Sequence, residues 1–143
     1  MTWLNKDDLT SLARPTTALS NFQIDAVLEI FRRSNPGMFF ALAAPCLSPA
    51  VIPSSVAFCA AIVHDADAKH WRLLTWENAA CPTILVWDSL SLDVDRDILH
   101  QAWRKILSLP ESHFQWLEVP QQGDGFSCGL WSLFWAERFA QDP

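Results

Sequence analysis

Cys128 lies in a sequence context that suits a nucleophile. A turn with two glycines, Gly123 and Gly125, leads into an apolar segment, Phe126–Phe139, that predicts a helix buried in the middle of the domain. The unpaired N–H groups and the dipole at the start of a helix favour a thiolate, which is the reactive form of cysteine. A small buried side chain at a helix start explains the same feature equally well, so Cys128 needs partners before a reaction can be inferred.

A nucleophilic cysteine needs a base within hydrogen-bonding reach, and that base needs an acceptor that orients it. His70 lies in a strand-like run, Lys69–Glu77, and Asp88 ends another, Thr83–Trp87, so adjacent strands could bring the two together. Taken singly, a histidine in a strand is more often structural, and an aspartate that closes a strand is usually a turn former. The joint pattern is stronger evidence for a cysteine–histidine–aspartate site than any one of these residues.

The other histidines and cysteines fit such a site less well. The remaining histidines lie beside a turn, in a surface-type helix and in a loop, respectively: His64, His100 and His113. The remaining cysteines are scattered through the chain: Cys46, Cys59 and Cys81. They form no CxxC pair and have no histidine at zinc-ligand spacing, so we expect reduced thiols, no metal and no cofactor.

The composition excludes several classes of function. The chain has 143 residues, half of them apolar, which is enough for one domain with a full core. Its formal net charge of -6 repels a phosphate backbone, so we expect no nucleic-acid partner. No apolar run approaches the roughly 20 residues of a membrane span, and Asp7 and Asp8 stand where a signal peptide needs a basic flank. We expect a soluble, monomeric protein of the nucleus or cytoplasm.

The elements that must position this site follow from periodicity and turn residues. Residues 1–17 read as an N-terminal arm with a short turn near Asn5–Leu12, and residues 18–143 as one catalytic domain. The arm is followed by a helix capped by Ser20 or Asn21, a short strand, a proline-rich loop and three strands in an antiparallel meander: Phe22–Arg33, Met38–Leu42, Pro45–Ser55, Val56–Val63, Lys69–Glu77 and Thr83–Trp87. A helix capped by Asp93 or Asp95 and a strand over Phe114–Val119 precede the buried helix. This order is typical of an α+β domain.

Several short motifs, in this order, resemble the signature of the ubiquitin-like-protein-specific cysteine proteases. They are His70-Trp71, Asp88-Ser89-Leu90, Pro120-Gln121-Gln122 and Gly125-x-x-Cys128-Gly129. Upstream, Leu19-Ser20-Asn21-Phe22-Gln23-Ile24-Asp25 resembles the start of a helix of this family, so the similarity extends from about residue 18 to residue 143. The family includes the SUMO proteases and is related in fold to the adenovirus protease. The resemblance implies a papain-like or adenain-like α+β fold, in which a central helix carries the cysteine against a mostly antiparallel sheet.

The resemblance also implies a role for each matched residue. Cys128 attacks the carbonyl carbon, His70 takes and returns the proton, and Asp88 holds the imidazole. Gln122 donates its side-chain amide to the oxyanion together with the backbone N–H of Cys128, with Gln121 as the alternative donor.

The substrate channel departs from the family pattern. Trp71 is expected to wall the narrow channel that admits a Gly-Gly tail, but the second tryptophan of the family falls on Ala18. An alternative register on Trp3-Leu4-Asn5-Lys6 restores that tryptophan but leaves the long apolar helix without a counterpart. We prefer the first register, in which Trp71 bounds the channel without a second tryptophan.

The leading function is therefore a cysteine peptidase or isopeptidase that cleaves after Gly-Gly in SUMO or a similar ubiquitin-like modifier. Two other enzymes use comparable residues: a compact viral or mobile-element maturation protease, and an effector-type acetyltransferase. A domain that only binds a modifier is the non-enzymatic alternative. The expected partner is a ubiquitin-like modifier or another protein substrate.

Overall fold

The computed structural model describes residues 18–41, 52–65 and 67–143. Helices and strands follow in this order: α2 (Asn21–Ser34), β1 (Met38–Ala41), β2 (Phe58–Asp65), β3 (His70–Glu77), β4 (Thr83–Trp87), α3 (Arg96–Leu107), β5 (His113–Trp116) and α4 (Cys128–Gln141). Within this described part, no helix is long and apolar enough to cross a membrane.

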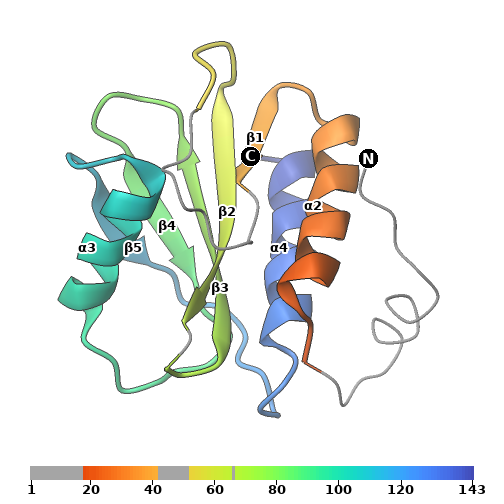
Figure 1. Cartoon of the computed structure of the whole chain (residues 1–143), viewed down its shortest axis with the longest axis vertical. Coiled ribbons are helices and arrows are strands. Elements are labelled where there is room, and N and C mark those ends of the chain that lie inside the picture. The colour runs from red at the N-terminus through yellow and green to blue at the C-terminus, as the bar shows by residue number, and fades with distance from the viewer. Residues whose placement is uncertain (1–17, 42–51, 66) are drawn as a thin grey trace.

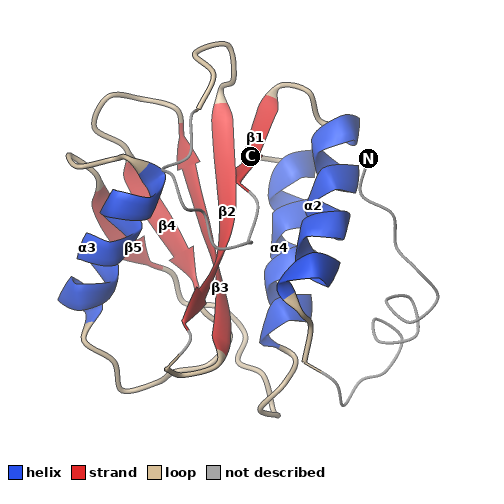
Figure 2. Cartoon of the chain, in the orientation of Figure 1, coloured by secondary structure: helices blue, strands red, loops and turns tan. Residues whose placement is uncertain are grey.

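The strands form one five-stranded sheet in the order β1-β2-β3-β4-β5. The expected meander is confirmed, because β3 pairs antiparallel with both β2 and β4. The edge strands β1 and β5 pair parallel to their neighbours, which the sequence pattern did not indicate. Helices α2 and α4 cover one face of the sheet and α3 covers the other, so the α+β class is confirmed (Figure 1, Figure 2).

Both surface helices begin where capping residues predicted. Ser20 accepts a hydrogen bond from the backbone N–H of Gln23, and the Gln23 side chain accepts one from the backbone N–H of Ser20. This reciprocal capping box satisfies backbone donors that the first turn of α2 would otherwise leave unpaired. At α3 the cap is Asp95, whose carboxylate accepts from the N–H groups of Asp97 and Ile98.

Strand β3 is the centre of the core because it is covered on both sides. Its side chains alternate between two buried clusters, as the pleat of a strand requires. Trp71 and Leu73 belong to the cluster beneath α2 and α4. Leu74 and Trp76 belong to the cluster beneath α3. Every residue of β3 except Glu77 is buried, so side chains at its first positions are shielded from water.

Helix α4 is not buried all round, contrary to the expectation. Ser132, Leu133, Trp135 and Ala136 are buried, but the Phe134 side chain is 46% exposed. The reason is that α4 lies on one face of the sheet beside α2, so one side of the helix remains open (Figure 1). Aromatic residues on that open side gave the segment its uniformly apolar pattern.

Other differences are local. Strand β5 begins at His113, which was expected in a loop, and ends at Trp116, three residues before the expected Val119. The expected turn over Asn5–Leu12 and most of the loop over Pro45–Ser55 lie outside the described residues.

Candidate active site

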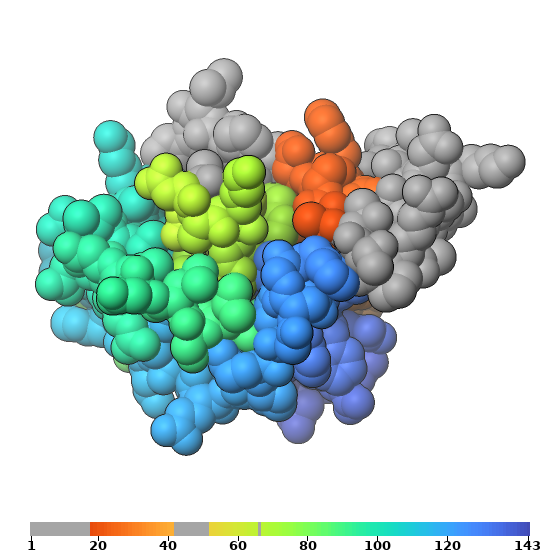
Figure 3. Space-filling view, turned by 90° about the horizontal axis from the view of Figure 1, so that it is seen from below, coloured from red at the N-terminus to blue at the C-terminus, as the bar shows by residue number. Residues whose placement is uncertain are grey.

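Three elements meet at one end of the sheet. Strand β3 begins there at His70, β4 ends there immediately before Asp88, and α4 begins there at Cys128. Figure 3 views the molecule from this end, where the turn before β3, the segment after β4 and the segment before α4 lie next to one another. The structure thus brings the three residues expected to react to one place, although they are up to 58 positions apart in the chain.

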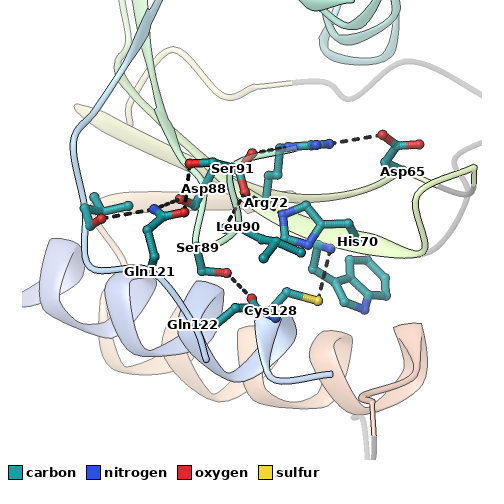
Figure 4. Close-up of polar contacts among 12 residues, drawn as sticks. Asp65, His70, Arg72, Asp88, Ser89, Leu90, Ser91, Gln121, Gln122 and Cys128 are labelled. Carbon is teal, nitrogen blue, oxygen red and sulfur yellow. Dashed lines mark hydrogen bonds and ion pairs between the residues drawn. The ribbon is translucent and has the colours of Figure 1, made fainter. Parts of the chain in front are cut away.

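Strand register explains the approach of Asp88 to β3. Leu73 pairs with Trp87 in the antiparallel ladder, so the next position along places Asp88 beside the start of β3. The ring Nε2 of His70 lies 2.5 Å from Oδ1 of Asp88, and both side chains are buried (Figure 4). Because Nε2 is engaged by the carboxylate, Nδ1 is the ring nitrogen available to Cys128.

Cys128 is 2% exposed and occupies the first turn of α4. Its Sγ accepts a hydrogen bond from the backbone N–H of Trp71 at 3.4 Å. The preceding turn is held by Asp124, whose Oδ1 accepts from the N–H groups of Phe126 and Ser127 at 2.9 and 2.7 Å. These bonds fix the turn that leads into α4, whereas the Ser127 side chain at the N-cap makes no capping bond.

The proton equilibria favour an ion pair between the ring and the sulfur. Burial by itself would lower the pKa of His70, but hydrogen bonds with Asp88 and Cys128 outweigh it and raise that pKa to about 9. Burial would raise the pKa of Cys128, but hydrogen bonds with His70 and the backbone of Trp71 bring it below its ordinary value. A lowered pKa of the thiol and a raised pKa of the ring both favour a thiolate beside an imidazolium, which is the form that attacks a carbonyl.

Cys128 differs from the other cysteines that the structure describes. Burial raises the pKa of Cys59 to about 12, so this residue remains a thiol in the core. Cys81 is exposed and free. Cys46 lies outside the described residues.

The two adjacent glutamines have different surroundings (Figure 4). Gln122 is buried; its Oε1 accepts from Ser89 at 2.5 Å and its Nε2 donates to the backbone carbonyl of Asp124 at 2.6 Å. One amide hydrogen of Gln122 therefore remains for a substrate oxygen. Gln121 donates Nε2 to the carbonyls of Asp88 and Val119, which uses both of its amide hydrogens. Of the two candidates for an oxyanion donor, the geometry favours Gln122.

Trp71 is tightly held beside the sulfur. Its indole N–H donates to the carbonyl of Leu19 at 3.1 Å, its ring is 5% exposed, and the ring of exposed His64 lies against it with centroids 4.4 Å apart. A substrate tail can reach only a small part of this ring as it stands. Ala18, where the family has a second tryptophan, is exposed, and Trp3 lies outside the described residues.

Two residues of the site were given no role by the sequence. Arg72 is buried and donates Nε to Oδ2 of Asp88 at 2.7 Å, and Ser89 holds the Gln122 amide. The signal for Arg72 was present, because alternation along a strand places it on the same face as His70, two positions away. A cation expected in a buried strand requires a buried anion nearby.

His100 and His113 lie away from the site. His100 lies in α3, where its Nε2 accepts from the indole N–H of Trp116 at 2.9 Å. His113 is exposed at the start of β5. Among the described residues, no group of three or more His, Cys, Asp or Glu side chains is arranged to hold a metal ion.

Sequence comparison gives no relatives, whereas comparison of structures gives many. No protein-family model matches the chain. No curated protein matches it in sequence. Thirty-one chains of solved structures match its fold.

The matching folds include several proteases. The C-terminal Ulp1 protease domain in complex with Smt3, the yeast orthologue of SUMO, matches with a TM-score of 0.73 and 16% identity over 95% of this chain and 71% of that chain. The Xanthomonas campestris effector XopD bound to ubiquitin matches with a TM-score of 0.69 and 22% identity over 90% of this chain and 76% of that one. A protease of ASFV matches with a TM-score of 0.61 and 14% identity, over 90% of this chain and 59% of that chain. The chain therefore has the Ulp1-like protease fold, as the sequence resemblance predicted.

Proposed function

We propose that this chain is a cysteine peptidase or isopeptidase that cleaves after Gly-Gly in SUMO or a similar ubiquitin-like modifier. The observation that carries the proposal is the convergence of Cys128, His70 and Asp88 at the start of α4, where His70 is bonded to Asp88 and the pKa values of His70 and Cys128 shift in opposite directions. The packing of a core does not require a cysteine and a histidine whose pKa values favour a thiolate–imidazolium pair, whereas acyl transfer does.

In the first half of the reaction, the Cys128 thiolate attacks the carbonyl carbon of the scissile bond. The carbonyl electron pair moves onto the oxygen, and a tetrahedral intermediate forms. His70 then gives the proton on Nδ1 to the departing amine, the carbon–nitrogen bond breaks, and a thioester to Cys128 remains. Asp88 keeps the ring in the orientation that this transfer needs.

The negative oxygen of the intermediate needs donors that are already in place. The backbone N–H of Cys128, at the start of α4, and the free amide hydrogen of Gln122 fill this role in the proposal. Ser89 fixes which end of the Gln122 amide is the nitrogen, because its hydroxyl donates to Oε1. One donor of this kind contributes about 3 kcal/mol to stabilising a transition state.

The second half repeats the chemistry with water. Neutral His70 takes a proton from the water as it attacks the thioester, and the thiolate leaves as the carboxylic acid product forms. The site then returns to the thiolate–imidazolium pair that the pKa values of Cys128 and His70 favour.

The choice of substrate is supported by solved structures that share this fold. The Ulp1 domain was captured with Smt3 and XopD with ubiquitin, and both share the fold over most of this chain. Because the ASFV protease also shares it, maturation of viral proteins is the competing function.

The decisive experiment is labelling by modifiers whose C-terminal glycine carries a thiol-reactive group. We expect a covalent adduct of SUMO, ubiquitin or a related modifier on Cys128, located by mass spectrometry. Cys128→Ala should give no adduct, and Cys81→Ser, which removes an exposed thiol outside the site, should react like the wild type.

Two results would redirect the proposal. Cleavage of unfolded or viral-type peptides without any modifier adduct would favour a maturation protease. Transfer of radiolabelled acetyl from acetyl-CoA to Cys128, without peptide cleavage, would favour the acetyltransferase alternative.

A further inference from the structure

Arg72 joins the site to the interior of the sheet. Its side chain is 1% exposed, although a guanidinium is rarely so deeply buried. Nε donates to Oδ2 of Asp88 at 2.7 Å, and Nη1 donates to Oδ2 of Asp65 at 3.3 Å (Figure 4). The guanidinium carbon lies 5.8 Å from the ring centroid of Trp116, and Nη2 has no hydrogen-bond partner among the described residues. The burial of this cation is compensated mainly by two carboxylates.

Arg72 completes the coordination of the Asp88 carboxylate. Oδ1 of Asp88 meets the ring of His70 and accepts from the backbone N–H of Leu90 at 3.1 Å. Oδ2 is held by Arg72 alone among the bonds of the described structure. With both oxygens engaged on opposite sides, the carboxylate is not free to rotate away from the imidazole.

Arg72 also changes the charge that His70 experiences. A buried carboxylate with no other cation beside it would stabilise the imidazolium fully. A carboxylate that is also paired with a guanidinium stabilises the imidazolium less. The pKa of His70 reflects this effect. Burial and then the positive charge of Arg72 lower it, whereas hydrogen bonds with Asp88 and Cys128 raise it. Asp65, on the far side of the guanidinium, partly offsets the positive charge.

We propose that Arg72 is a positioning residue for the reaction, which holds the Asp88 carboxylate in one orientation against His70 and shares its negative charge. The role rests on the proposed function, because it is defined by the Cys128–His70–Asp88 site. Arg72 touches neither the reacting sulfur nor any surface a substrate could reach. A basic imidazole holds its proton too strongly to release it to a leaving amine, so a shared carboxylate keeps His70 useful as an acid.

Few other charged side chains face the His70 ring and the Arg72 guanidinium. The His70 ring is faced by Asp88, Arg72 and Cys128, and His64 on β2 acts on it weakly through space. The Arg72 guanidinium is faced by Asp65 on β2, Asp88 after β4 and the ring of Trp116 on β5. From α3, Arg96 lies 4.2 Å over the same Trp116 ring and His100 accepts its indole N–H. A titration of His70 therefore reports chiefly on Arg72, Asp65, Asp88 and Cys128.

The test is the pKa of His70, followed by NMR of protein with ¹⁵N-labelled imidazoles and assigned with His70→Gln. Arg72→Met removes a positive charge beside Asp88, so the pKa of His70 should rise by about half a unit or more. Asp65→Asn removes the anion that offsets Arg72, so the pKa should fall. Arg72→Lys keeps the charge and should restore most of the wild-type value. Opposite shifts of this kind do not follow from a merely structural role.

Turnover provides the second measurement. Per active site titrated with the modifier probe, Arg72→Met should lower kcat about 10-fold or more and change KM less than about twofold, because the orientation of Asp88 and not substrate binding is altered. The assignment is overturned if folded Arg72→Met keeps both the wild-type titration and kcat, or if Arg72→Met and Asp65→Asn move the pKa in the same direction.

Two further outcomes are separable. If Arg72→Met does not fold, Asp65→Asn alone decides the assignment, because Asn keeps the acceptor that Ala68 uses in the turn and removes the negative charge together with the oxygen that accepts from Arg72. If the wild type labels with no modifier, the proposed function fails, while the NMR shifts, which need no substrate, still test the link between Arg72 and His70.

Discussion

Gln121 and Gln122 show how position separates two identical side chains. The backbone N–H of Gln122 donates to the carbonyl of Ser89 at 2.7 Å, which ties the segment before α4 to the segment after β4. The preceding side chain, Gln121, is exposed and donates to the carbonyl of Asp88 in that segment and to the carbonyl of Val119. Only Gln122 is left with a free amide hydrogen in a buried place.

We expect Gln122→Ala to lower kcat by ~100-fold or more with little change in KM, because its amide bonds the oxygen only when charge develops there. Gln121→Ala is the matched control and should keep kcat within about threefold, since its amide hydrogens already serve backbone carbonyls. Steady-state kinetics on a fluorogenic modifier substrate measures both. Equal losses in the two variants would remove Gln122 from the oxyanion hole.

The pH dependence of Cys128 reactivity should follow the ion pair. Alkylation by iodoacetamide, followed at the Cys128 peptide, should begin at a lower pH than for an ordinary thiol, whose pKa is roughly 8.5, because the pKa of Cys128 is lowered. Turnover should decline as the pH rises through about 9, where His70 loses its proton. Turnover falls and does not rise with pH because His70 must be protonated to give a proton to the leaving amine.

Asp88→Asn is the companion variant. It removes the strongest support for the imidazolium against burial, so the alkaline decline in turnover should move toward neutral pH and the onset of alkylation should move upward. An alkaline decline that stays near pH 9 in Asp88→Asn would show that another group controls it.

The roles of His70, Asp88 and Cys128 remain predictions, but their convergence could be foreseen from sequence. Each lies at an end of a clearly periodic element, and the order of the motifs resembles that of a family in which these residues act together. Arg72 and Ser89 were given no role because their significance lies in pairs, Arg72 with Asp88 and Ser89 with Gln122, that join separate segments. Periodicity assigns a residue to a face but does not identify what it meets there.

At the scale of elements, the start of α4 is pressed against its neighbours. A Cβ added to Gly129 would lie 3.2 and 3.3 Å from side-chain atoms of Leu19 and 3.3 Å from the ring of Trp71. The glycine thus lets the helix bring Cys128 within reach of the Trp71 backbone N–H. This requirement is steric, since no described glycine has a positive φ.

Gly129→Ala should therefore lower the alkylation rate of Cys128 several-fold. The helix start or the Trp71 ring must move by a few tenths of an ångström, which lengthens the bond from Trp71 to the sulfur. Global stability should change little, because alanine in a helix gains up to about 1 kcal/mol over glycine and offsets part of the strain. Gly125→Ala is the control, as nothing lies within 4 Å of its added Cβ, and it should react like the wild type.

Element boundaries were predictable where a cap or a breaker marked them, as at Ser20 before α2 and Asp95 before α3. Strand direction was not predictable, because the same alternation suits parallel and antiparallel partners. The parallel pairing of β5 with β4 matters for the site, since it runs the segment after β5 alongside the segment that carries Asp88 and Ser89. That pairing brings Gln122 to the candidate active site.

At the scale of the molecule, the sheet divides the core into two parts that serve different ends. Cys128 and Trp71 belong to the cluster shared with α2 and α4. The cluster beneath α3 contains Trp103 and no residue expected to react. A core substitution should therefore lower the free energy of unfolding equally on either side of the sheet. It should slow the reaction of Cys128 more on the side of α2 and α4 than on the side of α3.

Ile24 and Ile84 test this division with one substitution. Both side chains are fully buried, Ile24 in the first turns of α2 with the Cys128 cluster and Ile84 on β4, at the end away from Asp88. Changing either to alanine should lower the free energy of unfolding by about 2–5 kcal/mol, measured by urea titration. At a temperature where both variants remain folded, Ile24→Ala should slow alkylation of Cys128 several-fold, because the packing that seats the start of α4 loosens. Ile84→Ala should leave it within about twofold; equal slowing in both would mean that the sheet transmits core strain and does not insulate the site from it.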